Sequence, residues 1–329
     1  MRRVTNSGRT STDPADPRKR VPAAGQKLFI LSLRCGRLAN RLVIFANFIA
    51  LAEELGHRVC NVPFHSYAHL FESTRGDIYC RYPAPARRSV CDVVPGLATA
   101  IRKTRIFYHV ARASTRLNEM VPIGGRKVVT LREWPNQEVT RLEDPAVQAR
   151  FREARVVFAY GWRFRAPTWV VRHAEKIRAH LPPNAEYLQA SRETVARVRR
   201  QADVVVGVHV RRGDYLTWHD GRFYYEVPRY AAWMKEMAGR FPGRRVGFLV
   251  CSNEPRTVEE FPGLSVTVGQ GPAVVDLFAL AECDYLVGPP STYSQWASFY
   301  GNKPYLYLRS PEARIELEHF RVSDLLEIP

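Results

Sequence analysis

The stretch KLFILSLRCGRLANRLVIFANFIALAEELGHRV, residues 27–59, sets out the repeating unit of the fold. Lys27–Leu33 is an apolar run of strand length, and Cys35–Asn40 is a turn of small residues. Leu42–Leu55 is apolar at helical spacing, and Gly56 follows as a helix stop. The next residues, RVCNVP, predict a second strand. This succession predicts a β-α-β unit, the seed of a doubly wound parallel sheet.

A second series of alternating elements follows residue 184. Strands are predicted at DVVVGVHV, RRVGFLVCSN, YLVGPP and KPYLYL, and helices at NAEYLQASRETVARVRRQ, PRYAAWMKEMAGRF, AVVDLFALAECD and SQWASFYG. Between the two series, KVVTL and RVVFAYGW predict strands, and PTWVVRHAEKIRAHL predicts one amphipathic helix. Residues 60–150 are otherwise irregular. We therefore expect an N-terminal Rossmann-like domain at 27–185 and a C-terminal one at 186–329.

The composition is that of a globular, basic protein. The chain has 329 residues, 46% of them hydrophobic, and a formal net charge of +17. Such a surplus favours an anionic partner: a phosphorylated ligand, a nucleic acid or an acidic membrane surface. Charge alone does not choose among these three.

The N-terminus and the cysteines bear on location and metals. Residues 1–26 have no apolar core, which argues against a secretory signal and predicts a disordered basic tail; an organelle transit peptide stays open. No stretch approaches the roughly 18 apolar residues of a membrane span. Six scattered cysteines without a CxxC pair predict reduced thiols and no structural metal, at positions 35, 60, 80, 91, 251 and 283. We expect a cytoplasmic protein, at most peripheral at an anionic membrane.

The segment GVHVRRGDYLTWHD, residues 207–220, gathers polar groups at the end of a predicted strand. His209 and Arg211 are two residues apart and therefore share a face, at the end where parallel sheets bind ligands. Arg212 and Asp214 follow in the loop. Two guanidinium groups there suit phosphate oxygens, because each can donate two parallel hydrogen bonds. An ordinary solvated arginine–aspartate pair is the alternative.

Two further segments agree with a phosphate site. Asp276 begins a predicted helix, and STYSQW opens the next one with hydroxyl groups at 291, 292 and 294. Free N–H groups at a helix N-terminus bind phosphate, although plain N-capping is the simpler interpretation. The early turn CGRLANRL also joins strand to helix and carries one amide, Asn40.

Taken together and in this order, these segments resemble the α-1,2-fucosyltransferases. GRLANRLVIFANFIALAEELG is similar to their opening motif, and HVRRGDY matches their H-x-R-R-G-D-Y signature. CSNEP is similar to their F-S-D-D strand end, STYSQW to S-T-F-S-W-W, and YGWRFRAP faintly to G-Y-W-Q-S. The wider superfamily includes the α-1,6- and protein O-fucosyltransferases.

The resemblance implies a GT-B-like fold, in which two Rossmann-like doubly wound domains face a cleft. It implies GDP-fucose as donor on the C-terminal half, a glycan acceptor, inversion at the anomeric carbon, and no metal. Arg211 would bind the pyrophosphate, with His209 and Arg212 orienting it. Asp276 would accept hydrogen bonds from guanine or ribose. Phosphate oxygens would contact Thr292, Ser294 and Gln295, and Asn40 would reach across the cleft to the sugar or β-phosphate.

Departures from the family pattern leave the acceptor and linkage open. Ala39 replaces a glycine, Arg41 a glutamine, and Asn253-Glu254 stand where two aspartates are usual. Gln295 replaces a tryptophan, which is closer to the α-1,6 branch. The catalytic base is also open: Asp214 is the first candidate, followed by His219, Asp220 and Glu226.

Three other functions remain alternatives at this stage. A transferase of α-1,6 type or one using another GDP-sugar shares the donor motifs. A degenerate transferase would bind the nucleotide sugar without turnover. A nucleic-acid-binding protein accounts for the basic charge, but the sequence contains no recognisable RNA- or DNA-binding module.

Overall fold

The structure, a computed structural model, describes residues 25–85, 96–122, 124–133 and 139–326. The predicted tail falls outside these residues except for Gly25 and Gln26, and Cys91 lies outside them as well. Within the described residues no helix is long and apolar enough to cross a bilayer.

The N-terminal half contains a five-stranded sheet with the order β3-β2-β1-β6-β4. Its pairs are parallel except β2 with β3. The strands and helices of this half are β1 (Leu28–Leu31), α1 (Leu38–Leu55), β2 (Arg58–Asn61), η2 (Val62–Ser66), η3 (Ala68–Leu70), β3 (Arg81–Tyr82), α3 (Leu97–Lys103), α4 (Ile106–Met120), η4 (Gly125–Lys127), β4 (Val128–Arg132), β5 (Thr140–Arg141), α5 (Pro145–Ala149), β6 (Val156–Tyr160), β7 (Phe164–Arg165), α6 (Pro167–Arg172) and α7 (Ala174–His180). The strands β5 and β7 form a separate parallel pair.

The C-terminal half contains a second five-stranded sheet, entirely parallel, with the order β10-β9-β8-β11-β12. Its elements are α8 (Ala185–Arg199), β8 (Val204–Val210), η5 (Gly213–Leu216), η6 (Trp218–Gly221), α9 (Val227–Gly239), β9 (Val246–Ser252), η7 (Val258–Glu260), β10 (Ser265–Val268), α10 (Ala273–Glu282), β11 (Tyr285–Gly288), α11 (Thr292–Gly301), β12 (Tyr305–Tyr307) and η8 (Leu317–His319). This strand order is the doubly wound one, which confirms the predicted fold class.

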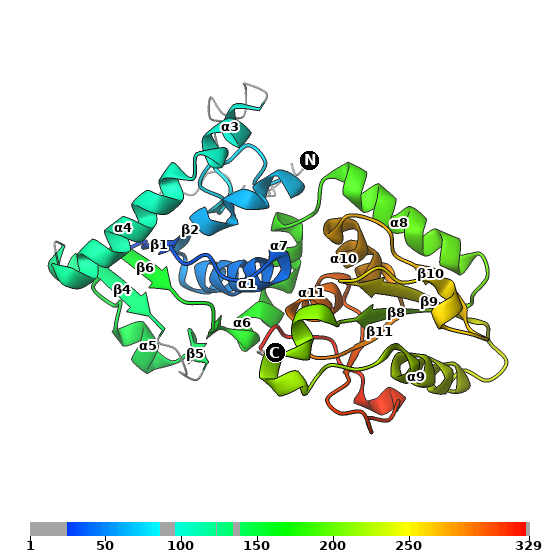
Figure 1. The fold of residues 1–329 in the computed structure, drawn as a ribbon. Coiled ribbons are helices and arrows are strands. Elements are labelled where there is room, and N and C mark those ends of the chain that lie inside the picture. Colours follow the sequence, from blue (N-terminus) through cyan, green and yellow to red (C-terminus); the bar gives the residue numbers. More distant parts are fainter. Residues whose placement is uncertain (1–24, 86–95, 123, 134–138, 327–329) are drawn as a thin grey trace, which may run out of the picture.

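The two halves lie side by side with α1, α10 and α11 between the sheets (Figure 1). Helix α1 buries nearly its whole length, which agrees with its apolar sequence and with Gly56 ending it in the left-handed conformation. One cluster of buried apolar side chains runs from β1 and α1 into α10 and α11. The two halves therefore share a core.

Local differences from the sequence predictions have physical reasons. The single helix expected at 167–181 is two, α6 and α7, because His173 leaves the helical region at φ −105° and ψ 19°. Its imidazole lies 2.8 Å from a carboxylate oxygen of Glu54 on α1. Strand β10 and helices α3 and α4 were not predicted. The strand SVTV is short and half-buried, so its pattern is weak.

Candidate active site

A cavity of about 820 Å³ lies between the two halves. The N-terminal half lines it with Gly36–Asn40, Tyr67, Leu70, Trp162 and Arg163. The C-terminal half lines it with residues at or after the carboxyl ends of β8, β9, β10 and β11. In each sheet the strand order reverses beside the first strand, between β1 and β6 and between β8 and β11. Ligands of open parallel sheets bind outside the strand ends at such points, and here the two points face one cavity.

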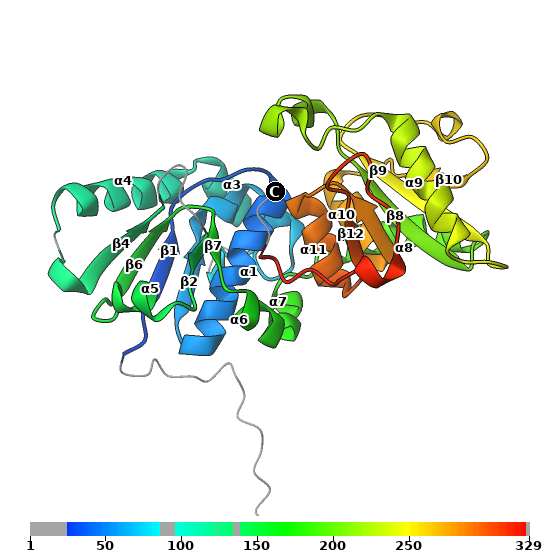
Figure 2. The same cartoon turned by 90° about the horizontal axis from the view of Figure 1, so that it is seen from below.

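Three helices begin at this cavity. Residues 36–40 precede and open α1, residues 271–274 precede and open α10, and residues 291–293 cap and open α11. Each helix N-terminus has N–H groups without intrahelical partners and the positive end of the helix dipole. Figure 2 shows α1, α10 and α11 gathered where the halves meet. The site therefore favours a negatively charged ligand.

Arg211 lines the cavity directly after β8. Its Nη2 donates to Asp214 Oδ2 at 2.7 Å, and its guanidinium lies 5.2 Å from the centre of the Tyr215 ring. The Nε atom is buried and has no hydrogen-bond partner. Arg211 thus keeps donor capacity for a ligand while Asp214 and Tyr215 hold it in place.

Arg212 is turned away from the cavity. Its guanidinium forms an ion pair with Glu226 at 2.7 Å, another with Glu254 at 3.5 Å, and donates to the hydroxyl of Tyr224. Two carboxylates therefore already neutralise it, and it is not among the residues that line the cavity. In this conformation the Arg212 side chain does not reach the cavity, and its predicted part in binding the donor stays a prediction. Asp214 is paired with Arg211.

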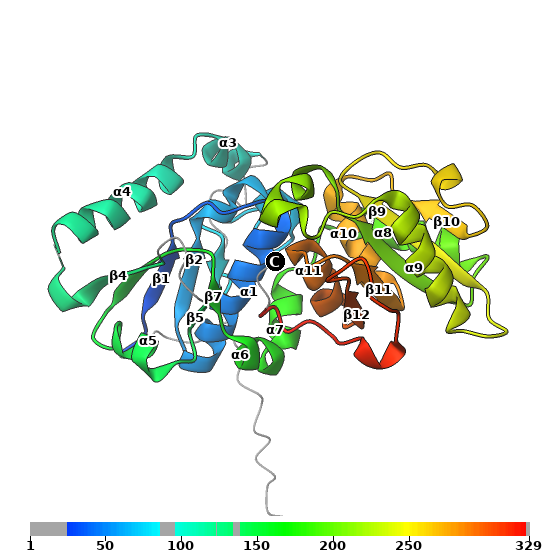
Figure 3. The same cartoon turned by 60° about the horizontal axis from the view of Figure 1, so that its bottom comes forward.

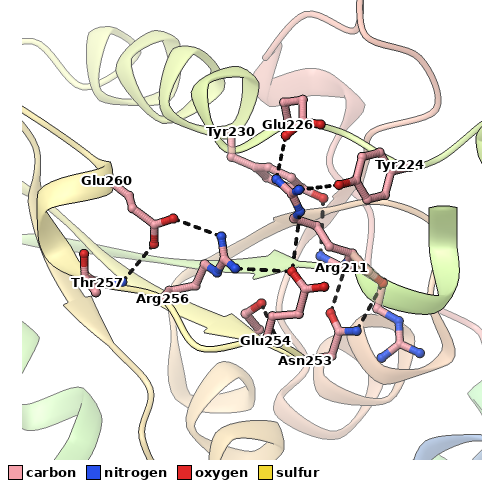
Figure 4. Close-up of polar contacts among 11 residues, drawn as sticks. Arg211, Tyr224, Glu226, Tyr230, Asn253, Glu254, Arg256, Thr257 and Glu260 are labelled. Atoms are coloured by element: carbon pink, nitrogen blue, oxygen red, sulfur yellow. Dashed lines mark hydrogen bonds and ion pairs between the residues drawn. The ribbon is translucent and has the colours of Figure 1, made fainter.

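The backbone of Arg212 is fixed by Asn253. Asn253 accepts a hydrogen bond from the Arg212 N–H at 2.9 Å and donates one to its carbonyl at 3.1 Å (Figure 4). A carboxylate has no proton to donate to that carbonyl, so the asparagine matches this contact better than the aspartate expected from the family pattern. Gly213 follows at φ +59°, where a Cβ would lie 2.8 Å from Asn253 Nδ2. The positive φ and the close approach of Asn253 both require glycine at position 213.

A further chain of ion pairs holds the segment after β9. Figure 4 shows Arg256 between Glu254 at 3.2 Å and Glu260 at 2.9 Å. Glu260 also accepts from the backbone N–H of Thr257, completing a capping box at η7. This arrangement fixes the carboxylate that faces Arg212.

His209 lies on the floor of the site. The residue is 4% exposed, its Nδ1 is 2.8 Å from the Ser294 hydroxyl, and the centre of its ring lies 4.9 Å from that of Tyr293. Burial, with a smaller contribution from Arg211, lowers the pKa of His209 to about 3. The imidazole is therefore neutral at physiological pH, and it positions neighbouring groups without carrying charge.

Asp276 lies in the first turn of α10 and lines the cavity. It is 7% exposed, and its Oδ1 has no partner. Burial raises the pKa of Asp276 to about 6, against a smaller opposing effect from the N–H of Gly271. A buried, unpaired acceptor beside a cavity is costly unless a ligand donates to it. Asp276 therefore fits a group with N–H or O–H donors.

The start of α11 meets α1 across the cavity. Thr292 donates its hydroxyl hydrogen to Asn40 Oδ1 at 2.6 Å, so two predicted binding residues from opposite halves contact each other. Ser291 caps the helix by accepting from the N–H of Tyr293. The Tyr293 hydroxyl donates to the carbonyl of Ala273 at 2.6 Å and so links the beginnings of α11 and α10.

Two predicted phosphate ligands are not at the cavity surface. Ser294 contacts His209, and Gln295 is fully buried with neither amide atom hydrogen-bonded. In this conformation neither side chain lines the cavity, and their predicted contact with phosphate stays a prediction. Ser294 and Gln295 are the third and fourth residues of α11, and both are buried in the interior, away from the cavity that the helix N-terminus faces.

Aromatic side chains at the cavity were not singled out from the sequence. Tyr67 and Trp162 come from the N-terminal half, and Tyr215, Trp218 and Tyr293 from the C-terminal half. The run YLTWHD after the arginine motif was the available signal, because two aromatic residues and a histidine follow a strand end there. Flat apolar faces of this kind suit sugar rings and bases.

The base candidates differ in their access to the cavity. Asp214 and His219 line it, whereas Asp220 and Glu226 do not. His219 and Asp220 both adopt left-handed backbone conformations, at φ 46° and 55°. Such strain in residues other than glycine is held by the surrounding structure and concentrates at functional sites. No group of three or more histidine, cysteine, aspartate or glutamate residues spaced for a metal ion occurs among the described residues.

Comparisons with known proteins agree with this geometry. Residues 170–314 match the model of glycosyl transferase family 11. Over these residues, which make up less than half of the chain, the sequence is similar to that family. The chain is 28% identical over 193 residues to galactoside alpha-(1,2)-fucosyltransferase 1 of Oryctolagus cuniculus, covering 55% of this chain and 49% of that protein. The Mus musculus protein of the same name is 26% identical over 190 residues, which cover 55% of this chain and 48% of that protein.

The chain thus spans about half the length of the curated relatives it matches. Among solved structures, a mutant of Arabidopsis thaliana FUT1 in complex with GDP superposes with a TM-score of 0.55 at 12% identity, over 90% of this chain and 73% of that protein. POFUT1 in complex with GDP-fucose superposes with a TM-score of 0.51 at 12% identity, over 86% of this chain and 96% of that protein. At these identities the likeness concerns the fold, which is GT-B-like as predicted.

Proposed function

We propose that this chain is an inverting fucosyltransferase that moves fucose from GDP-fucose to a hydroxyl group of a galactoside-containing glycan. The observation that carries the proposal is the meeting of Arg211 and the N-termini of α1, α10 and α11 at one cavity. The α-1,2 relatives and the GDP-bound proteins of like fold support the choice of donor.

In this proposal the diphosphate lies against Arg211 and the start of α11. The guanine or ribose donates a hydrogen bond to Oδ1 of Asp276, which has no hydrogen-bond partner in the protein without ligand. The fucose faces Asn40 and the aromatic residues of the opposite half. Arg211 and the helix dipoles stabilise the negative charge that develops on GDP as it leaves, and no metal ion is required for this.

The reaction is a single displacement. The acceptor oxygen forms a bond to the anomeric carbon, the bond from that carbon to the phosphate oxygen breaks with its electron pair leaving on GDP, and a base takes the hydroxyl proton. We assign the base to Asp214, because its carboxylate is half-exposed at the cavity and is held 2.7 Å from Arg211.

Asp214→Asn tests this assignment. Turnover should fall about 10²- to 10⁴-fold, the usual contribution of a general base. GDP binding should change little, because the asparagine amide still fills the same space beside Arg211. His219→Ala is the matched comparison; a larger loss in turnover there than in Asp214→Asn would move the base to His219.

The donor is tested by thermal shift. GDP and GDP-fucose should raise the melting temperature, and UDP- and ADP-sugars should not; ligand at 100 times its Kd adds about 2.7 kcal/mol of stability. Turnover with GDP-fucose should persist in EDTA. Stabilisation by another GDP-sugar alone would indicate a different transferase, and a strict need for Mn²⁺ or Mg²⁺ would contradict the metal-free mechanism. Linkage analysis of the product separates α-1,2 from α-1,6 transfer.

A further inference from the structure

Helix α4 presents an apolar stripe to solvent. Ile106, Val110, Leu117 and Met120 are 55%, 55%, 49% and 80% exposed, and Val121 directly after the helix is 56% exposed. The spacings of four, seven and three residues put the helical positions on one face. Large apolar side chains gathered on one exposed face mark a contact surface.

The fold does not need this stripe. The opposite face of α4 supplies Tyr108, Ala111 and Thr115 to the interior, where Tyr108 and Ala111 pack with Val62. That face covers the N-terminal sheet, and α4 lies along the outer side of this half in Figures 1 and 3. No residue of α4 lines the cavity described above.

Basic side chains flank the stripe. Lys103, Arg105, His109 and Arg116 are exposed beside it. Glu119 is the one acidic residue in the stretch 96–122, and Arg132 binds it with Nε···Oε1 at 2.5 Å. An apolar stripe bordered by cations is the pattern of a helix that lies in the interface of an anionic bilayer. A second copy of the chain fits less well, because pairing through this face brings two basic flanks together.

We propose that the outer face of α4, the stripe Ile106–Val110–Leu117–Met120 with its basic border, docks the protein on an anionic lipid surface. The helix lies parallel to the membrane with its apolar side chains among the acyl chain ends and its basic side chains at the headgroups. In Figure 2 helix α4 lies on the same side of the molecule as the segment following β8, which lines the cavity. Docking would thus bring the cavity near a surface-borne acceptor.

Vesicle flotation of the full chain tests this surface. The protein should bind phosphatidylcholine vesicles with 30 mol% phosphatidylglycerol at least ~10-fold better than pure phosphatidylcholine, and added salt should weaken binding because it screens the charges. Leu117→Asp should reduce binding ~10-fold or more. Val171→Asp is the matched control: Val171 is 61% exposed on α6, and this variant should bind like the wild type.

The basic border has its own test. Lys103→Glu with Arg116→Glu should lower binding at least ~10-fold, since each basic side chain near an anionic surface contributes about fivefold. Arg200→Glu with Arg314→Glu makes the same change in net charge at exposed positions in the C-terminal half, and should lower binding much less. Equal losses in the two pairs would mean that overall charge, not α4, binds the lipid.

Two readings complete the test. The circular dichroism spectrum and the GDP-induced thermal shift should be unchanged in every variant, which separates an effect on docking from one on folding or on the donor site. If Leu117→Asp does not fold, the double variant Leu117→Ser with Val110→Ser takes its place. Wild-type binding by that variant would overturn the proposal. So would a concentration-dependent dimer, measured by sedimentation, that Leu117→Asp abolishes.

Discussion

At the scale of the residue, the two neighbouring arginines after β8 have different surroundings. Arg211 lines the cavity and pairs with Asp214, whereas Arg212 does not line it, pairs with Glu226 and Glu254, and donates to Tyr224. A planar guanidinium that still has donors can bind a diphosphate at two points, and one that is already paired stabilises the loop. Two consecutive arginines therefore have different roles: Arg211 faces the ligand cavity, and Arg212 stabilises the loop.

Replacing each arginine by lysine separates these purposes. Arg211→Lys keeps the charge but removes the fork, so turnover should fall ~10²-fold or more, and GDP affinity should fall with it. Arg212→Lys should reduce turnover less and lower the melting temperature slightly, because it loosens contacts to Glu226 and Glu254. Steady-state kinetics and thermal denaturation measure both; near-wild-type turnover in Arg211→Lys would remove this residue from the donor site.

Asp276 links the site to stability. Its pKa is about 6 in the fold against an ordinary 3.8, so the folded protein binds more protons than the unfolded chain between these pH values. Stability therefore falls as pH rises from about 4 to 6, and the cost persists above 6. Asp276→Asn should remove this cost, raising the free energy of unfolding by roughly 1–3 kcal/mol at pH 8.

Denaturant titrations at pH 4 and pH 8 check this prediction. The gain in the free energy of unfolding from Asp276→Asn should shrink at pH 4. At that pH the folded wild type has a protonated, neutral Asp276, and the asparagine of the variant is neutral as well. GDP should bind the variant more weakly, because an accepting carboxylate has been lost. A gain that does not depend on pH would contradict the assignment.

At the scale of the element, α10 and α11 pack closely enough to bring their N-termini to one cavity. A Cβ on Gly301, at the end of α11, would lie 1.9 Å from the carbonyl oxygen of Ala281 on α10. The missing side chain is what permits this approach. At the other ends of the helices, the Tyr293 hydroxyl bridges to Ala273 at 2.6 Å.

Gly301→Ala should therefore force the two helices apart. We expect a loss of at least ~2 kcal/mol in the free energy of unfolding, the scale of overpacking a core, together with weaker GDP binding. Gly239→Ala is the control: it ends α9 with nothing within 4 Å of its Cβ position, and should be neutral or slightly stabilising. Urea denaturation measures both, and equal effects would contradict the close packing.

At the scale of the whole molecule, the two sheets share one apolar cluster. Phe71 from the N-terminal half and Phe278 from α10 pack with ring centres 6.2 Å apart, and Arg178 Nε donates to the carbonyl of Phe299 at 2.9 Å. Neither half buries these groups alone. The cavity is formed by the same contact, since its walls come from both halves.

We therefore expect one cooperative unfolding transition. Calorimetry should give a ratio of calorimetric to van't Hoff enthalpy near 1, and GDP should shift the whole transition upward. The fragment 27–185 should not fold by itself. Two resolved transitions, of which GDP moves only the second, would show instead that the halves unfold independently.

Periodicity alone predicted most elements of both sheets. The apolar runs at 28–31 and 204–210 and the helical spacing of 42–55 need only local patterns, and the α/β class follows from their alternation. The strand-end rule likewise placed Arg211 at a ligand crevice before any geometry was known. Local pattern was too weak for half-buried β10 and for the break at His173, where a contact with Glu54 on a distant helix decides the backbone.

Side-chain direction was beyond the reach of the sequence. The letters RR do not say that Arg211 faces the cavity and Arg212 faces Glu226, or that Gln295 is fully buried while Thr292 meets Asn40 from the other half. Each of these depends on residues that are far away in the chain. The sequence by itself determined the elements, their alternation and the chemistry at the strand ends, because these depend on neighbours along the chain. Only the tertiary structure decided which charges stay unpaired at the cavity, because that depends on neighbours in space.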